Sequence, residues 1–490
     1  MPAAKITHAV VRMYRLGTGD CFVLKFFAKE KESFKLMIDA GCWVAKKAEL
    51  DPKIQDLLDY VDRHVDLLVV THEHKDHVAA FDVCKDLFCN GSNAFSADQI
   101  WMAWTENDED PRVKEWKDEY GTARRALHAA RNQLEAAVNS AASESDRDGA
   151  RGMLLHFSER VNDLLKLAAD DPGTYAGPLA GMTVVKDDIA RGRYQTLKPG
   201  QIQENLKGAG GIRFYVLGPP ELYAEIKTEA GGPGESYDHN KVLKRNSGFA
   251  AAALSLSNGG PAEPPFDSAK WIPESNAQQN ELIQAYFSEE EAWRRIDDDW
   301  LISTGDLALR MDSLTNNLSL ALAIEFEDSG RVMLFPGDAE FGSWASWHKI
   351  EWREEPRKEG LHFTEDLLRR TVFYKVAHHL SHNGTARALG LEMMTHKALA
   401  AMATLDYSNI SSGWKSTMPN RAIVGELLRR TKGRLMIMNN KDLFMDFDGE
   451  VPLEQEIENA RKQMSAGEKK KFESAFDDSN PHYVEYTVIA

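Results

Sequence analysis

Cysteine is scarce in this sequence: four residues, Cys21, Cys42, Cys84 and Cys89, occur in a chain of 490. So few thiols at these spacings form neither a disulfide framework nor a paired Cys-x-x-Cys metal knuckle. Structural disulfides are typical of oxidising compartments, so we expect reduced thiols and a cytoplasmic protein.

Long apolar runs are also missing. The sequence has no stretch of about 18 consecutive apolar residues, which is the length that indicates a transmembrane helix. It starts Met1-Pro-Ala-Ala-Lys, without the apolar segment of a secretory signal. We therefore expect neither a membrane-spanning nor an exported protein, and no membrane among its partners.

Positive charge is in deficit. The 59 lysines and arginines are outnumbered by 76 aspartates and glutamates, which gives a formal net charge of −17. This charge opposes long-range attraction of polyanions. A nucleic-acid substrate would therefore need a local basic patch or bound metal cations to hold it.

What the sequence does contain is the composition of a folded protein, with 43% hydrophobic and 28% charged residues. Runs rich in β-branched and aromatic residues predict strands, at 6–14, 21–27, 34–38, 65–70, 212–217, 318–326, 331–335, 372–377, 399–405, 435–438 and 483–488. Helical spacing predicts helices over 78–88 and 421–431. The alternation of strands and helices at both ends predicts an α/β protein.

Two long segments interrupt this alternation. Residues 107–211 contain apolar residues at helical spacing over 124–141 and again over 153–167, which predicts an inserted antiparallel helical hairpin. We expect it to pack against the protein or to bind a protein partner or a second copy, with cofactor binding as the alternative. Residues 222–312 have a Gly/Pro-rich centre and are expected to form an irregular excursion or a lid. The sheet protein then comprises residues 1–106, 212–221 and 313–490.

The most specific pattern is Thr71-His-Glu-His-Lys-Asp-His77, directly after the apolar strand 65–70. Side chains two apart at a strand end lie on one side, so His72 and His74 can bind one metal ion. Asp76 and His77, around the turn, can face a second ion. Imidazole and carboxylate ligands suit zinc and also accept manganese. The alternative is a polar loop whose groups bond only to one another.

The motif His-x-His-x-Asp-His after a strand resembles that of the metallo-β-lactamase fold. The resemblance implies a four-layer αβ/βα sandwich that binds two divalent metal ions. By the same resemblance Asp39 orients the metal loop, Asp338 bridges the two ions, and His378 is the last histidine ligand.

Other segments narrow the resemblance to the ComEC-like branch, named after the hydrolase domain of DNA-uptake channels. The similar segments are Leu16-Gly-Thr-Gly-Asp-Cys-Phe, Val216-Leu-Gly-Pro-Pro, Asn316-Asn-Leu-Ser-Leu-Ala-Leu, Pro336-Gly-Asp-Ala-Glu and Lys375-Val-Ala-His-His-Leu-Ser-His-Asn-Gly-Thr. Two departures stand out. Leu380 occupies a position that is usually glycine, and the superfamily's middle histidine ligand has no clear counterpart, with His156 and His239 as the nearest candidates.

The resemblance implies that two cations sharing Asp338 lower the pKa of a bridging water. Asp76 would ligate and accept the proton of that water, and His382 or His379 would protonate a leaving oxygen or else orient the ligands. Ser381 and Lys375 would support the ligands; Lys375 could alternatively bind phosphate or be solvated.

The expected activity is hydrolysis of a phosphodiester, by a nuclease or nucleotide phosphodiesterase. One alternative is a hydrolase of a carbonyl ester, lactone or lactam, because this fold serves many chemistries. The other is a gated or non-catalytic subunit of a larger assembly, motivated by the insertions and the absent middle histidine.

Overall fold

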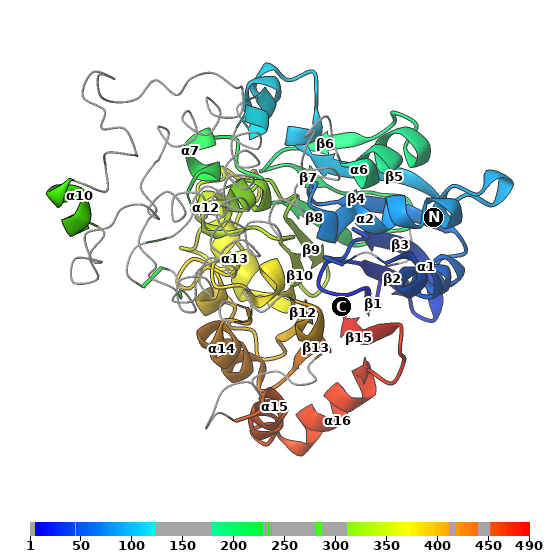
Figure 1. Cartoon of the computed structure of the whole chain (residues 1–490). Coiled ribbons are helices and arrows are strands. Elements are labelled where there is room, and N and C mark those ends of the chain that lie inside the picture. Colours follow the sequence, from blue (N-terminus) through cyan, green and yellow to red (C-terminus); the bar gives the residue numbers. More distant parts are fainter. Residues whose placement is uncertain are drawn as a thin grey trace.

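The structure is a computed structural model that describes residues 5–44, 46–118, 120–122, 179–228, 231, 234–235, 237, 280–286, 311–410, 415, 418–439 and 451–490. The strands of this part of the chain form two mixed sheets (Figure 1). The predicted helical hairpin and most of the predicted excursion, with His156 and His239, lie outside the described residues.

The first sheet has eight strands. In order across the sheet they are β14 (Phe476–Asp477), β15 (Tyr483–Ile489), β1 (His8–Tyr14), β2 (Phe22–Ala28), β3 (Lys31–Ile38), β4 (His64–Val70), β5 (Ser96–Ala103) and β6 (Gln195–Leu197). Strands β14 to β3 pair antiparallel, whereas β3 to β6 pair parallel. Because β15 pairs with β1, the two ends of the described chain meet in this sheet.

The second sheet has seven strands. They are β13 (Leu435–Asn439), β12 (Ala400–Asp406), β11 (Thr371–Lys375), β10 (Arg331–Phe335), β9 (Leu322–Phe326), β8 (Ile212–Val216) and β7 (Ile202–Gln203). Strands β10 to β13 are parallel and β7 to β10 are antiparallel. Each sheet thus has a parallel half and an antiparallel half.

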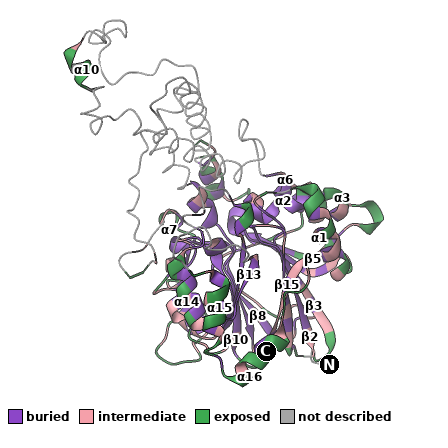
Figure 2. Cartoon of the chain, turned by 60° about the horizontal axis from the view of Figure 1, so that its bottom comes forward, coloured by how far each residue is buried: buried purple, intermediate pink, exposed green. Residues whose placement is uncertain are grey.

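The sheets pack face to face over an apolar core contributed by both, including Val11, Leu24 and Val69 from the first and Ile324 and Phe373 from the second. These inner strands are buried (purple in Figure 2). Alternating side chains point outward into two further cores. The α/β class is confirmed, in the form of two mixed sheets packed as a sandwich.

Helices cover the outer faces. Those on the first sheet are α1 (Lys47–Tyr60), α2 (Lys75–Val83), α3 (Lys85–Phe88) and α6 (Ala180–Thr183) with η4 (Val184–Ile189). Those on the second are α7 (Tyr223–Ile226), α12 (Phe341–Trp347), α13 (Phe363–Arg369), α14 (Arg421–Thr431) and α15 (Leu453–Arg461). The remaining elements are α10 (Glu281–Tyr286), α16 (Ala466–Ala475), and the short turns η1 (Gly91–Asn93), η2 (Trp104–Glu106), η7 (Ala377–Leu380), η8 (Leu391–Met393) and η9 (Tyr407–Asn409).

The structure differs from the sequence-based boundaries at one place that matters. Strands β6 and β7 lie within the predicted helical insertion 107–211, and each adds an edge strand to one sheet. They contain three and two residues, too few to produce an alternating apolar pattern. The last part of that segment therefore belongs to the sheets rather than to a helical arm.

Candidate metal centre

Loops from both sheets meet at one edge of the sandwich. Asp39 follows β3, residues 72–77 follow β4, Asp338 follows β10, and residues 378–379 follow β11. Asp20 precedes β2, which runs antiparallel to β3 and so begins at the same edge. The carboxyl ends of parallel strands in an open sheet are where α/β proteins place their ligand sites.

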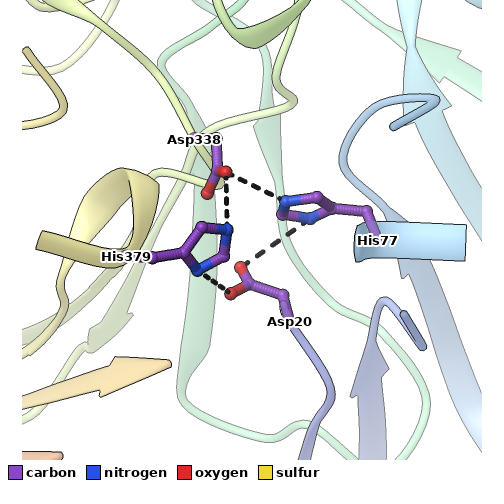
Figure 3. Close-up of side chains that lie close together, drawn as sticks. All are labelled: Asp20, His77, Asp338 and His379. Carbon is purple, nitrogen blue, oxygen red and sulfur yellow. Dashed lines mark ion pairs between the residues drawn. The ribbon is translucent and has the colours of Figure 1, made fainter. Parts of the chain in front are cut away.

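The centre of this edge is a group of four side chains, Asp20, His77, Asp338 and His379, which we call the buried cluster (Figure 3). The Oδ2 atom of Asp338 lies 3.1 Å from Nε2 of His77 and 3.0 Å from Nε2 of His379. Asp20 approaches the Nδ1 atoms of both histidines at 3.8 Å. All four side chains are at most 2% exposed.

Asp76 borders the buried cluster from the start of α2. Its Oδ2 atom lies 3.1 Å from Nε2 of His379, and its Oδ1 atom lies 4.0 Å from Nε2 of His77. The glycine at position 41 allows this approach, because a Cβ atom there would lie 2.3 Å from the backbone nitrogen of His77. The metal loop and the turn after β3 therefore pack backbone against backbone.

The outer nitrogens of the two cluster histidines are fixed by hydrogen bonds. Nδ1 of His77 lies 2.8 Å from Oδ2 of Asp39, and Nδ1 of His379 lies 2.8 Å from Oγ1 of Thr404. Thr404 in turn donates its hydroxyl proton to Asp20 at 2.7 Å. Both histidines therefore donate from Nδ1 and present Nε2 to the cluster, the arrangement that orients a metal-binding imidazole.

Lys375 supplies the cluster with a fixed positive charge. It is 1% exposed, and its Nζ lies 2.5 Å from Asp20 Oδ2 and 3.0 Å from Asp338 Oδ1. It also donates to the carbonyl oxygen of Gly337 at 2.8 Å. The alternative of a solvated Lys375 is wrong: the last residue of β11 points between the two sheets, where these carboxylates lie.

The charged groups of the buried cluster shift one another's pKa values. Burial lowers the pKa of His379, but the carboxylates of Asp338 and Asp76 raise it to about 9. Burial likewise opposes protonation of His77, yet Asp338 and Asp76 raise its pKa well above the ordinary value. Burial raises the pKa of Asp338, whereas His379 and Lys375 lower it well below its ordinary range. Without a metal ion, protons on the two histidines balance the carboxylates.

Several atoms of the cluster that could bind a metal ion lie close to one another but make no hydrogen bond. Nε2 of His77, Oδ1 of Asp76 and Oδ2 of Asp338 are buried and have no hydrogen-bond partner among the described residues. Unpaired buried polar atoms are costly and rare. Two imidazole nitrogens and carboxylate oxygens are the donor set that zinc and manganese accept. The residues present therefore fit a divalent cation.

His72 and His74 lie beside this cluster. Nε2 of His72 is 3.2 Å from Nδ1 of His74, close enough for both to ligate one ion at about 2.0–2.1 Å. Nδ1 of His72 lies 3.2 Å from the hydroxyl of Ser319, which enters from the second sheet. Burial, then the neighbouring His77 and His74, lower the pKa of His72 well below its ordinary value. His72 is thus neutral, as a metal ligand must be.

A second group, Asp312, Glu340 and His378, lies next to the buried cluster; we call it the Asp312 group. Nδ1 of His378 is 3.3 Å from Glu340 Oε1, and its Nε2 is 4.0 Å from Asp312 Oδ2. Asp312 Oδ1 lies 3.9 Å from Nε2 of His74. The amide of Asn316 donates to Glu340 at 2.9 Å and to Asp312 at 3.1 Å.

The backbone after β11 sends its two adjacent histidines to different groups. His378 and His379 have φ angles of 46° and 49°, and Leu380 has a φ of 67°. These left-handed conformations cost about 1 kcal/mol or more per non-glycine residue and concentrate at functional sites. The imidazole of His378, expected to be the last ligand, lies in the Asp312 group, whereas His379, expected to be catalytic, lies in the buried cluster.

Ser381 and His382 follow in the same loop. Ser381 donates to Oδ1 of Asn383 at 3.1 Å, and the same Oδ1 lies 3.2 Å from Nδ1 of His378. Ser381 therefore reaches His378 through Asn383. His382 is half-buried, with its Nδ1 3.4 Å from the Ser381 hydroxyl. It belongs to neither group.

Sequence reasoning assigned no role to Asp20, Asp312 or Glu340. Asp20 and Glu340 each carried a signal, because both lie inside segments on which the expected resemblance was based. Asp312 carried none, since it sits at the end of the predicted excursion, far from any motif. Their carboxylates are recognisable only once the loops are assembled.

No family model matches the chain, and a search of curated proteins also finds no match. Among the described residues, no helix has the combined length and apolar character that crossing a bilayer requires.

Proposed function

We propose that this protein is a metal-dependent hydrolase of the metallo-β-lactamase fold that cleaves a phosphodiester, as a nuclease or a nucleotide phosphodiesterase. The observation that carries the proposal is the buried cluster, in which Nε2 of His77 and of His379 converge on one carboxylate oxygen of Asp338 at 3.1 and 3.0 Å. Two mixed sheets with helices on their outer faces support the fold assignment.

His77, His379, Asp338 and Asp76 are the proposed ligands of a zinc or manganese ion. The nitrogens of His72 and His74 are the proposed ligands of a second ion beside it. When bound, such cations supply a water of lowered pKa and neutralise negative charge on the group under attack.

The remaining residues hold these ligands in their working state. Asp39 and Thr404 fix the histidine tautomers through the Nδ1 atoms. The ammonium of Lys375, 3.0 Å from Oδ1 of Asp338, stabilises the ionised form of that carboxyl. Burial raises the pKa of Asp76, but His77 and His379 lower it to about 2, which suits an anionic ligand better than a proton acceptor at neutral pH.

The proton for the leaving oxygen requires a donor outside the ligand set. His379 lies between two carboxylates inside the cluster, so we assign it to metal binding. His382 sits half-buried in the loop that follows and is the proposed donor. Histidine is the side chain that ordinarily exchanges a proton near neutral pH.

The charge of the chain favours a small substrate. A net charge of −17 repels long duplex nucleic acid, so contacts at the metal centre would have to outweigh that repulsion. Short single strands and nucleotides carry fewer phosphates and are repelled less. The similarity to the ComEC-like branch favours a phosphodiester over a carbonyl substrate.

The test is hydrolysis by the purified full-length chain, supplemented with Zn²⁺ or Mn²⁺. The substrates are single-stranded DNA, duplex DNA, RNA, cyclic dinucleotides and bis-nitrophenyl phosphate, with nitrocefin and a lactone panel as carbonyl substrates. We expect turnover of a phosphodiester that is lost in Asp338→Ala and His74→Ala and retained in Asp328→Asn, a surface control. Turnover of only the carbonyl substrates would contradict the proposal, as would equal turnover by the wild type and the two site variants.

A further inference from the structure

The two loops that follow β10 and β11 each contribute to both groups of candidate ligands. The first provides Asp338 to the buried cluster and, two residues later, Glu340 to the Asp312 group. The second provides His379 to the buried cluster and the adjacent His378 to the Asp312 group. The same pair of loops therefore places a carboxylate and an imidazole together twice. The first such arrangement fits a divalent cation. We therefore asked whether the second, the Asp312 group, also binds one.

Asn316 gives an independent indication of a ligand. It lies one turn after Asp312 in the helical segment 311–316 and is fully buried. Its Nδ2 contacts Glu340, Asp312 and His378 at 2.9, 3.1 and 3.3 Å, whereas its Oδ1 is buried without a hydrogen-bond partner among the described residues. Rotating the side-chain amide by half a turn exchanges these two atoms. The orphaned oxygen would then face all three donors of the group.

The negative charge of the Asp312 group also favours a bound cation. The Asp312 carboxylate has no lysine or arginine ion pair within the described part of the chain, only the Asn316 amide and two distant histidine nitrogens. Its side chain is 10% exposed and lies in one group with the carboxylate of Glu340. A carboxylate largely removed from water and not paired with a cation is electrostatically unfavourable. A bound divalent ion would remove that cost.

We propose that Asp312, Glu340 and His378 form a separate divalent-cation site beside the buried cluster, with the side-chain oxygen of Asn316 as a fourth donor. Two carboxylates and an amide oxygen with one imidazole make an oxygen-rich donor set. Oxygen donors favour Mn²⁺ and Mg²⁺, whereas nitrogen- and sulfur-rich sets favour Zn²⁺. The site is therefore expected to bind Mn²⁺. Binding of a cation at this site does not depend on the proposed reaction.

The test is the number of Mn²⁺ ions bound by the full-length chain. Chelated protein is loaded with Mn²⁺, freed of excess metal by gel filtration, and assayed by inductively coupled plasma mass spectrometry. We expect at least two equivalents in the wild type and one fewer in Asp312→Asn and in His378→Gln. His64, Asp66 and Asp98 form a further group of candidate metal ligands, of which Asp98 is exposed; Asp98→Asn is therefore the matched control, expected to retain the wild-type stoichiometry.

Circular dichroism establishes that each variant is folded before its metal is counted. A crystal of the Mn²⁺-loaded chain, with anomalous diffraction at the manganese edge, supplies a readout that needs no variant: we expect a peak bounded by Asp312, Glu340 and His378. Unchanged stoichiometry in both Asp312→Asn and His378→Gln would overturn the proposal, as would loss in Asp98→Asn alone or the absence of that peak. Hydrolysis assays separate the proposed function from the proposed cation site. If the wild type shows no turnover but Asp312→Asn still binds one ion fewer, only the proposed function is contradicted.

Discussion

The buried cluster and the Asp312 group are neighbours that share two loops, yet the negative charge of their carboxylates is compensated differently. In the buried cluster, Lys375 pairs with Asp20 and Asp338, and the raised pKa values of the two histidines keep protons on them. In the Asp312 group, burial lowers the pKa of His378 to about 4, so its imidazole is neutral at physiological pH. The carboxylates of Asp312 and Glu340 accept hydrogen bonds from the amide of Asn316, and Glu340 also accepts one from the hydroxyl of Ser313.

The two groups therefore differ in whether a metal ion must displace protons when it binds. At the buried cluster a metal ion has to replace protons on His77 and His379, so binding releases protons and weakens as the pH falls. At the Asp312 group the histidine is already neutral, and a metal ion there adds positive charge beside Asp312, which has no lysine or arginine ion pair among the described residues. In the buried cluster the charges are compensated even without a metal ion. In the Asp312 group the negative charge is unfavourable until a metal ion binds.

The largest effect is expected from removing the internal cation of the buried cluster. Lys375→Met leaves Asp20 and Asp338 buried without their ammonium partner. Removing one member of a buried ion pair typically costs about 3–5 kcal/mol. We expect a loss of that size in the free energy of unfolding of the chelated protein, measured by urea denaturation.

The control for this prediction is Lys349→Met, which removes an exposed lysine paired with Glu225. A surface substitution of this kind changes stability by about 0.5 kcal/mol or less. Equal unfolding midpoints for the Lys375 and Lys349 variants would show that the buried lysine does not balance the cluster.

The pH dependence of stability gives the next largest effect. The pKa of His379 is raised to about 9 in the folded chain, against an ordinary value of about 6.5 when unfolded. A raised pKa stabilises the fold fully below the unfolded value, and that stabilisation is lost as the pH rises through the folded value. Chelated protein should therefore lose roughly 1–3 kcal/mol between about pH 6.5 and 9.

Urea midpoints across that pH range, with and without Mn²⁺, measure the effect. The metal-loaded protein should lack the decline, because metal binding replaces the protons and strengthens as they leave. A chelated protein with the same midpoint at pH 6.5 and pH 9.5 would contradict protonated histidines in the cluster.

The two regions also differ in how far their residues could be predicted from sequence. The α/β class and most of the strands were predictable, because the alternation of apolar runs and turns is local. The motif over residues 72–77 was visible for the same reason: it occupies one short loop after one buried strand. Asp338 was found only through resemblance, since Gly-Asp is a common dipeptide.

What could not be predicted depends on backbone conformation and on distant loops. His378 and His379 are adjacent and chemically identical, and left-handed φ angles decide which one faces Asp338. Asp20 and Thr404 are joined by a hydrogen bond across 384 positions of sequence. Asp312 lies beyond a long segment with no periodic pattern. No local spacing predicts such contacts.

A smaller effect is expected from the carboxylate behind His77. Asp39→Asn keeps the shape of the side chain but weakens the hydrogen bond that fixes the histidine tautomer. Partners of this kind typically contribute 10–100-fold to metal affinity. We expect Mn²⁺ affinity at the buried cluster to fall by about that factor in isothermal titration, whereas Asp98→Asn leaves it unchanged. An affinity equal to wild type in Asp39→Asn would show that this bond does not prepare the site.

The smallest effect on stability is expected at Asp312, and its sign separates the two regions. Because its part-buried position, together with Glu340 and Asp76, raises the pKa of its carboxyl well above the ordinary value, the charged form opposes folding at neutral pH. Asp312→Asn should therefore leave the chelated protein as stable as wild type or more so, opposite to the loss in Lys375→Met. With Mn²⁺ present the order should reverse, since wild type gains stability from the ion and the variant does not. Thermal unfolding with and without Mn²⁺ measures both signs, and a loss of stability in the chelated variant would mean that the Asp312 group is already balanced without metal.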